Sequence, residues 1–203
     1  MKTKFIELLR STGRDGIETV ISNLEKLGFF EAPASTKFHL GYKGGLVEHS
    51  LNVCLMAEKI RKMLIESNPE MEKRLPLESV RLAALTHDVC KAEVYKEGSR
   101  NVKNPTTGVW EKVPCYEADY SHLPLGHGEK SVIRLMAWGV KLTVDEMLAI
   151  RWHMSAWDLA LQSAEAKGNL NAARDKCPLL TLLQTADMLA SGIMETEEAP
   201  NLS

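Results

Sequence analysis

The chain contains the stretch Leu82-Ala-Ala-Leu-Thr-His87-Asp88-Val-Cys-Lys91, in which an apolar segment rich in alanine and leucine runs into three polar side chains. The apolar part predicts a buried helix. Residues four apart share a helical face, so we expect His87 and Lys91 to lie on one side. A buried charge without a partner costs free energy. Because a metal ion suits an adjacent imidazole and carboxylate, the pair His87 and Asp88 predicts further ligands elsewhere in the chain.

The bulk composition is that of a soluble globular protein. The 203 residues are 44% hydrophobic and 26% charged, and the formal net charge is -2. The chain therefore has no excess of basic residues that would indicate an obligatory nucleic-acid partner. The four cysteines are dispersed and form no CxxC pair, and no stretch has the character of a signal peptide or a transmembrane helix. We therefore expect reduced thiols, no membrane partner and a cytoplasmic location.

Hydrophobic residues recur at helical spacing along most of the chain. Asp15 and Thr143 precede two of these segments as helix caps, and Gly28 is expected to end the first. Residues 168–176 are expected to form a polar loop. The expected helices cover residues 3–10, 15–28, 46–65, 76–91, 126–138, 143–153, 155–166 and 178–190.

A different pattern follows Lys91. Val, Tyr and Trp occur in residues 94–103 and 108–115, and the segment between them has the composition of a turn. The sequence therefore predicts an all-α helical bundle with a small β-hairpin inserted at about 94–115.

The domain organisation follows from length and periodicity. A chain of 203 residues suits a single domain over 1–203. Within it we expect N-terminal helices at 3–28 and a core at about 36–192. The acidic segment 195–203 is expected to be a frayed C-terminal tail.

Six polar residues lie on the inward faces, or at the ends, of the expected helices. They are His49, His87, Asp88, His127, His153 and Asp187. A single inward histidine is more often a hydrogen-bonded core residue than a metal ligand, but here several helices each contribute such a group. Helical bundles build metal sites from inward side chains on facing helices. Imidazole and carboxylate ligands without thiolate suit Fe, Mn, Co, Ni or Zn in a hydrolytic role.

The order of these residues, H…HD…H…H…D, resembles the HD-domain superfamily of metal-dependent phosphohydrolases. The resemblance covers about residues 36–192 and implies an HD-type helical bundle. The segment Tyr42-Lys-Gly-Gly-Leu-Val-Glu-His49-Ser is also similar to the HD domain attached to certain bacterial 3′→5′ exoribonucleases, and to uncharacterised bacterial and phage HD hydrolases. Six positions in order are specific for the superfamily and far less specific for a substrate.

The resemblance also implies roles for the six residues. One divalent metal would be held by His49, His87, Asp88 and Asp187. A second would be held by His127 and His153, with Asp88 as the bridge. Such a pair generates hydroxide near neutral pH and neutralises phosphate oxygens, which makes Asp88 and Lys91 the catalytic candidates. The alternative is a single metal, with His127 binding phosphate at the N-terminus of its helix. The sequence does not distinguish Fe, Mn, Co, Ni, Zn and Mg.

Candidate substrate-binding residues surround this set. Lys91 is expected to face the substrate phosphate as a point charge. Lys43 lies between glycines on the loop before His49. Tyr120, His122 and Arg151 complete the candidates, and for each of these three a place on the surface or in packing is the alternative.

The predicted function is hydrolysis of a phosphate ester in a nucleotide or a similar small metabolite by metal-activated hydroxide. One alternative is a phosphodiesterase or 3′→5′ exonuclease acting on RNA or a cyclic nucleotide. Against it stand the net charge, the lack of an accessory nucleic-acid-binding segment and the lack of a Gly-Tyr-Pro signature after Lys91. Two further hypotheses are a non-catalytic nucleotide-binding HD protein and a purely structural bundle. The oligomeric state stays open.

Overall fold

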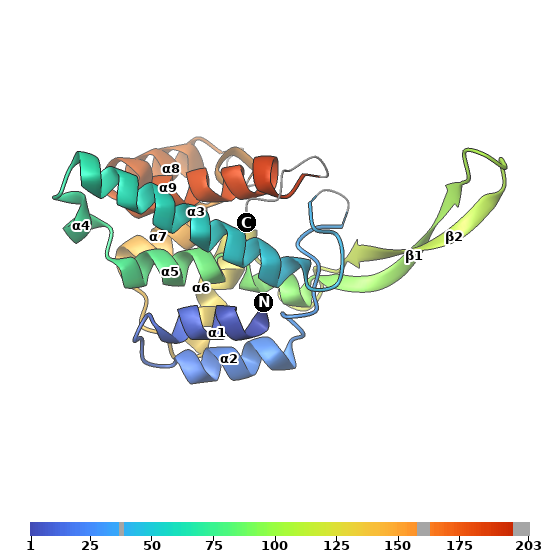
Figure 1. Cartoon of the computed structure of the whole chain (residues 1–203), viewed down its shortest axis with the longest axis horizontal. Helices are drawn as coiled ribbons and strands as arrows, with labels where there is room; N and C mark the ends of the chain where they lie inside the picture. The colour runs from blue at the N-terminus through green and yellow to red at the C-terminus, as the bar shows by residue number, and fades with distance from the viewer. Residues whose placement is uncertain (37–38, 158–162, 197–203) are drawn as a thin grey trace.

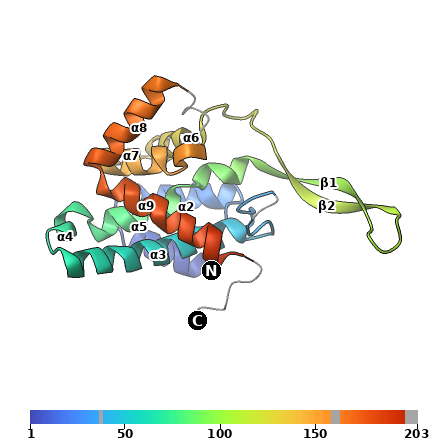
Figure 2. The same cartoon turned by 90° about the horizontal axis from the view of Figure 1, so that it is seen from above.

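The computed structural model describes residues 1–36, 39–157 and 163–196, and its longest described helix is α3 (Gly45–Ser67). Helix α3 packs against α5 (Leu77–Thr86) and α9 (Pro178–Leu189). Helix α9 also packs against α7 (Val144–Trp152), which in turn contacts α6 (His127–Ala137). Figures 1 and 2 show these helices gathered into one bundle.

Shorter and outer elements complete the bundle. Helices α1 (Lys2–Arg10) and α2 (Ile17–Lys26) pack against each other, and α1 also packs against α5. The short α4 (Met71–Arg74) connects α3 to α5, and α8 (Ala164–Lys176) packs against α9. Among the residues that the structure describes, the other helical segments are the 3-10 turns Val89–Glu93 and Ser155–Trp157 and the π-helical turn Ala190–Met194.

Apolar side chains from the central helices form the core. Leu46 of α3, Leu82 and Leu85 of α5 and Leu180 of α9 are all fully buried. Burial of one such side chain stabilises the fold by about 1.5–3 kcal/mol. The polar ligand candidates therefore lie at the ends of helices whose packing is set by apolar contacts.

Local signals in the sequence explain several helix ends. Thr143 caps α7 in a capping box with Glu146, as predicted. Gly28 ends α2 with a φ of 73°, which favours glycine. The N-cap of α2 is Gly16 and not the predicted Asp15, because the chain enters this helix through a left-handed residue with a φ of 85°.

The hairpin is confirmed. Strands β1 (Tyr95–Lys103) and β2 (Trp110–Ala118) pair antiparallel in register, with Tyr95 opposite Ala118 and Lys103 opposite Trp110. The Asn104 side chain accepts two backbone N–H groups within the turn. The hairpin projects from the bundle (Figure 1), so its outer half is exposed on both faces.

The predicted fold class, a helical bundle with a small inserted hairpin, is therefore confirmed. The prediction of a polar loop over 168–176 is wrong, because these residues belong to α8. Of the helix predicted over 155–166, residues 155–157 form a 3-10 turn, and residues 158–162 lie outside the described residues.

No single described helix is long and apolar enough to cross a membrane. A membrane span by length and composition alone is reached only when two helical segments, Ala164–Lys176 and Pro178–Met194, are counted together. The chain bends by 102° between these two segments.

Candidate metal centre

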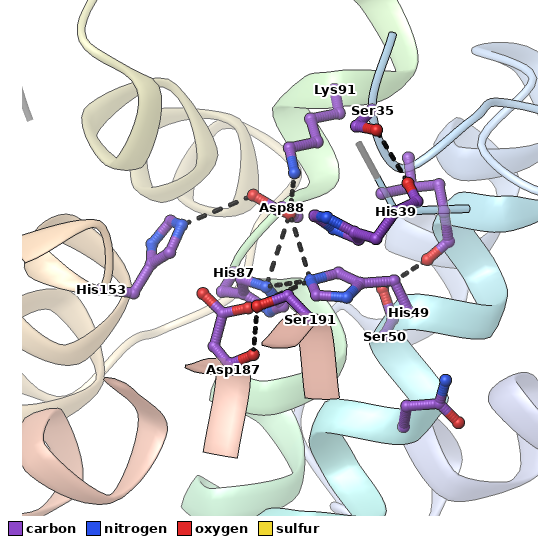
Figure 3. Close-up of polar contacts among 12 residues, drawn as sticks. Ser35, His39, His49, Ser50, His87, Asp88, Lys91, His153, Asp187 and Ser191 are labelled. Carbon is purple, nitrogen blue, oxygen red and sulfur yellow. Dashed lines mark hydrogen bonds and ion pairs between the residues drawn. The ribbon is translucent and has the colours of Figure 1, made fainter. Parts of the chain in front are cut away.

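The six predicted ligands are brought together by five elements of the bundle. His49 is the fifth residue of α3, and His87 follows the last residue of α5. His127 is the first residue of α6, and His153 follows the last residue of α7. Asp187 comes from the last turn of α9, and Figure 3 shows its side chain close to those of His87 and His49.

A glycine permits the close approach of two of these elements. A Cβ atom at Gly128 would lie 2.3 Å from the backbone oxygen of Arg151 and 2.6 Å from that of Ile150. Real side chains do not tolerate such distances, so only glycine allows the first turn of α6 to pack on the end of α7. This contact places His127 beside His153, with ring centroids 5.2 Å apart.

Three ligand atoms gather around the Nε2 atom of His49. This atom lies 3.3 Å from His87 Nε2, 3.3 Å from Asp187 Oδ1 and 3.6 Å from Asp88 Oδ2. His87 Nε2 lies 3.5 Å from the same Asp88 oxygen. These separations suit ligands of one metal ion, for which each atom would lie about 2.0–2.2 Å from the centre.

The second carboxylate oxygen of Asp88 faces a different pair of imidazoles. Asp88 Oδ1 lies 2.5 Å from His127 Nε2 and 3.4 Å from His153 Nε2. The two oxygens of one carboxylate therefore face two separate sets of ligands. This geometry suits a carboxylate that bridges two metal positions.

Backbone carbonyls orient two of the imidazole rings. His87 Nδ1 donates to Ala84 O over 2.9 Å, and His153 Nδ1 donates to Ile150 O over 2.7 Å. Each Nδ1 thus carries the proton, which leaves the Nε2 lone pair directed at the ligand cluster.

The surroundings of the His153 ring show whether a bound cation would suit this site. Its Nε2 atom is buried and makes no hydrogen bond within the described part of the chain, although Asp88 Oδ1 is 3.4 Å away. A lone pair facing a carboxylate oxygen is unfavourable unless a cation lies between them. A divalent metal fits this arrangement, and the nitrogen and oxygen donors suit a first-row transition metal.

Electrostatics keep the bridging carboxylate ionised. Burial alone would raise the pKa of Asp88, but Lys91, His87 and His127 hold it well below its usual value. Burial would lower the pKa of His127, whereas Cys90 and Asp88 raise it to about 10. Without metal, the negative Asp88 carboxylate is therefore paired with protonated neighbours.

The two rings of the other cluster differ in protonation. Burial lowers the pKa of His87 to about 4, so this imidazole is neutral at pH 7. Burial acts in the same direction on His49, but hydrogen bonds with Asp187 and Glu195 raise the pKa of His49 to about 9. A metal ion must therefore displace a proton from His49.

Lys91 contacts the ligand cluster from a different secondary-structure element than predicted. The α-helix ends at Thr86, and Lys91 lies on the 3-10 turn Val89–Glu93, so His87 and Lys91 do not share the face of one continuous α-helix. His87 keeps helical backbone angles, and the chain leaves the α-helical path at Asp88, which has a φ of -109° and a ψ of 15°. Figure 3 shows the Lys91 side chain pointing toward Asp88. Lys91 Nζ lies 2.6 Å from Asp88 Oδ2, and the Lys91 side chain is 12% exposed. This contact places its charge at the rim of the ligand cluster.

Two predicted substrate-binding residues contact other side chains. Lys43 pairs with Glu31 at 3.3 Å, and both side chains are exposed. Arg151 Nη2 lies 2.7 Å from a Glu129 oxygen, and the guanidinium lies 4.0 Å from the centroid of the Trp152 ring. Substrate binding by Lys43 and Arg151 stays a prediction.

The two predicted residues after the hairpin lie on the surface. Tyr120 is 64% exposed. His122 is also largely exposed, with its Nδ1 atom 3.2 Å from Arg134 Nη2 and 3.7 Å from a Glu93 oxygen. Their roles in binding substrate likewise stay predictions.

Two residues beyond the predicted set, Glu195 and His39, lie beside His49. The Glu195 carboxylate is buried beside His49 Nδ1, which corrects the prediction that the acidic tail is frayed from residue 195. Residues 197–203 lie outside the described residues. The His39 ring lies beside that of His49, with centroids 5.0 Å apart (Figure 3). Neither residue lies at an inward position of a periodic helix, so no pattern in the sequence marked it.

Comparison with known families gives one match. A family model described as HD domain matches residues 46–192, which is well over half of the chain and includes all six ligand candidates. No curated protein and no solved structure gives a match. The match agrees with the helical bundle and with the clusters of histidine and aspartate side chains described above. The chain therefore belongs to the HD-domain family, whose members are generally metal-dependent phosphohydrolases.

Proposed function

We propose that this protein hydrolyses a phosphate ester of a nucleotide or a similar small metabolite, with two divalent metal ions in its centre. The observation that carries the proposal is the arrangement around Asp88. One of its oxygens faces His49 and His87, and the other faces His127 and His153. A bridged pair of metal positions is typical of enzymes that act on phosphate esters.

The residues of the chain have separate tasks in this reaction. Metal ions bound here would activate the attacking water and neutralise the phosphate oxygens. Asp88 would contribute one carboxylate oxygen to each of the two metal positions. Lys91 supplies a positive charge at the rim of the centre, and Asp88 raises the pKa of Lys91 despite burial, so the ammonium stays charged at neutral pH. That charge favours binding of an anionic phosphate group.

The limited exposure of the centre supports a small substrate. His49, His87 and Asp88 are at most 2% exposed as side chains. The exposed atoms belong to the rim, where the side chains of Asp187 and His127 are 20% and 28% exposed. A terminal phosphate of a small molecule suits such a recessed centre. We accordingly propose a small-molecule partner with no obligatory nucleic acid and no membrane.

The finer similarity to exoribonuclease HD domains defines the competing substrate class. The test is one screen of purified protein loaded separately with Mn²⁺, Co²⁺, Ni²⁺ and Zn²⁺. The substrates are a chromogenic phosphomonoester, a chromogenic phosphodiester, a panel of nucleotides including cyclic ones, and short RNA. We expect turnover of phosphomonoesters, and of a subset of nucleotides, without cleavage of RNA.

Two aspartate variants make the screen specific to the centre. Asp88→Ala should bind less metal and lose hydrolysis, whereas Asp175→Ala, at an exposed position of α8, should retain both. Diester or RNA cleavage without monoester turnover would replace the proposed substrate class. Metal binding by the wild-type chain without hydrolysis of any substrate would contradict the proposed activity.

A further inference from the structure

The C-terminal end of the described chain enters the metal centre. Glu195 follows the π-helical turn Ala190–Met194, and its backbone N–H donates to Ala190 O over 3.0 Å. This bond closes the π-helical turn, which packs against α3. Glu195 lies outside the segment matched by the family model, 46–192, so the match assigns no role to it.

Both carboxylate oxygens of Glu195 have polar side chains beside them. Its two oxygens lie 3.1 Å and 3.0 Å from His49 Nδ1, and Asn52 Nδ2 donates to one of them over 3.0 Å. His39 Nε2 lies 3.7 Å from the other oxygen. The side chain of Glu195 is 1% exposed. A buried carboxylate is costly without such partners, so these contacts define one conformation.

We infer that Glu195 is a positioning residue for the metal centre, which accepts the Nδ1–H of His49 and so directs the Nε2 lone pair of His49 at the metal. The inference rests on the metal centre proposed above and not on the identity of the substrate. Histidine ligands of metals commonly donate their second N–H to a carboxylate, which fixes the ring and makes it a stronger ligand.

His49 differs in this respect from the other two oriented rings. His87 and His153 donate to carbonyls three residues earlier in their own helices. The corresponding carbonyl before His49, that of Leu46, accepts from the Ser50 hydroxyl. His49 instead takes an acceptor 146 residues away in sequence. The segment that ends at Glu195 and the N-terminal part of α3 are therefore coupled through one ligand.

A separate metal position at His39, His49 and Glu195 is the competing interpretation, because their ligand atoms also lie close together. It would require His49 to bind metal through Nδ1 as well as Nε2. An imidazole that does so must lose both of its protons, which is unfavourable at neutral pH beside two carboxylates. The contact with Glu195 therefore serves the Nε2 metal and not a metal of its own.

The test compares Glu195→Ala, Glu195→Gln and the control Glu165→Ala, whose residue is exposed on α8. Dissociation constants for Co²⁺ and Zn²⁺ are measured by competition with a chromophoric chelator, and folding is checked by circular dichroism. Loss of an outer partner of a ligand typically costs about 10- to 100-fold in metal affinity. We expect Glu195→Ala to lose affinity in this range and Glu165→Ala to be unchanged. Glu195→Gln, which keeps an acceptor oxygen, should lose less.

A second readout separates positioning from a general structural effect. Side-chain ¹H–¹⁵N NMR of the Zn²⁺-loaded protein should show the proton of His49 on Nδ1. Equal metal affinity of Glu195→Ala and Glu165→Ala, or a His49 proton on Nε2, would overturn the inference. If the wild-type chain binds three metal ions and Glu195→Ala binds only two, then His39, His49 and Glu195 form a separate metal position. Wild-type chain that binds metal but hydrolyses nothing would defeat the proposed function and leave this inference standing.

Discussion

Asp88 lies between two groups of imidazoles, and each group contains one ring, His49 or His127, whose raised pKa affects how the centre takes up metal. Burial would lower the pKa values of both His49 and His127. Hydrogen bonds with Asp187 and Glu195 nevertheless raise the pKa of His49 to about 9, and Cys90 and Asp88 raise that of His127 to about 10. Both rings are therefore protonated at pH 7 in the metal-free protein. Each must lose a proton before its Nε2 atom can bind a metal.

Metal affinity should accordingly rise with pH. Below pH 9 each position requires displacement of one proton, so we expect its association constant to increase about tenfold per pH unit between pH 6 and pH 8. Chelator competition with Co²⁺ over this range measures the slope, and calorimetry in two buffers counts the released protons. His122→Gln, at an exposed position, should keep the wild-type slope. An affinity that does not change with pH would contradict the protonated state of His49 and His127.

The residues of the centre were predictable to different degrees. His49, His87, His153 and Asp187 stand among apolar residues at helical spacing, so periodicity alone marks them as inward. Glu195 stands in the acidic run Glu195-Thr-Glu-Glu, where composition predicts a solvated tail. Its burial depends on a long-range contact with His49, and such a contact leaves no local pattern.

At the scale of elements, α7 shows how a local signal positions a ligand. Thr143 Oγ1 accepts the backbone N–H of Glu146, and the Glu146 carboxylate accepts the backbone N–H of Thr143. The same helix ends at Trp152, so its placement determines where His153 lies.

Removing this cap should weaken the helix measurably. Loss of a threonine N-cap costs about 1 kcal/mol, which for a domain of this size lowers Tm by about 2–4 °C. We expect this shift for Thr143→Ala in thermal unfolding followed by circular dichroism. Thr181→Ala, at an exposed position within α9, should not lower Tm, because alanine favours a helix interior. Equal Tm values for the two variants would show that the capping box does not stabilise α7.

The prediction of secondary structure was wrong where the apolar periodicity of the sequence was weak. Helix α8 contains Gly168 and two asparagines, which favour a loop by composition. Only Ala166, Leu170 and Ala173 of this helix are buried, at spacings of four and three, and this narrow stripe packs against α9. Tertiary packing overrides the local preference here. The hairpin was predictable because its turn residues act locally.

For the whole molecule, the ligands of the centre join parts of the fold that are distant in sequence. They come from α3, the end of α5, α6, the end of α7 and α9, and span residues 49–187. In the unfolded chain these groups are dispersed, so a metal ion bound by all of them favours the folded state. Without metal, the same groups place a buried carboxylate among several imidazoles, an arrangement that depends on the packing of every contributing helix.

Metal should therefore raise the thermal stability of the entire bundle. A ligand at 100 times its Kd adds about 2.7 kcal/mol to the free energy of unfolding, which corresponds to a rise in Tm of about 5–10 °C for a chain of this length. The measurement is thermal unfolding of wild-type protein with saturating Mn²⁺ or Co²⁺ and with excess EDTA. The Asp88→Asn variant, which keeps the shape but lacks the bridging charge, should show a much smaller difference between the two conditions. A wild-type Tm that is the same in metal and in EDTA would mean that the clustered side chains do not form a metal centre, because binding restricted to the folded state must stabilise it.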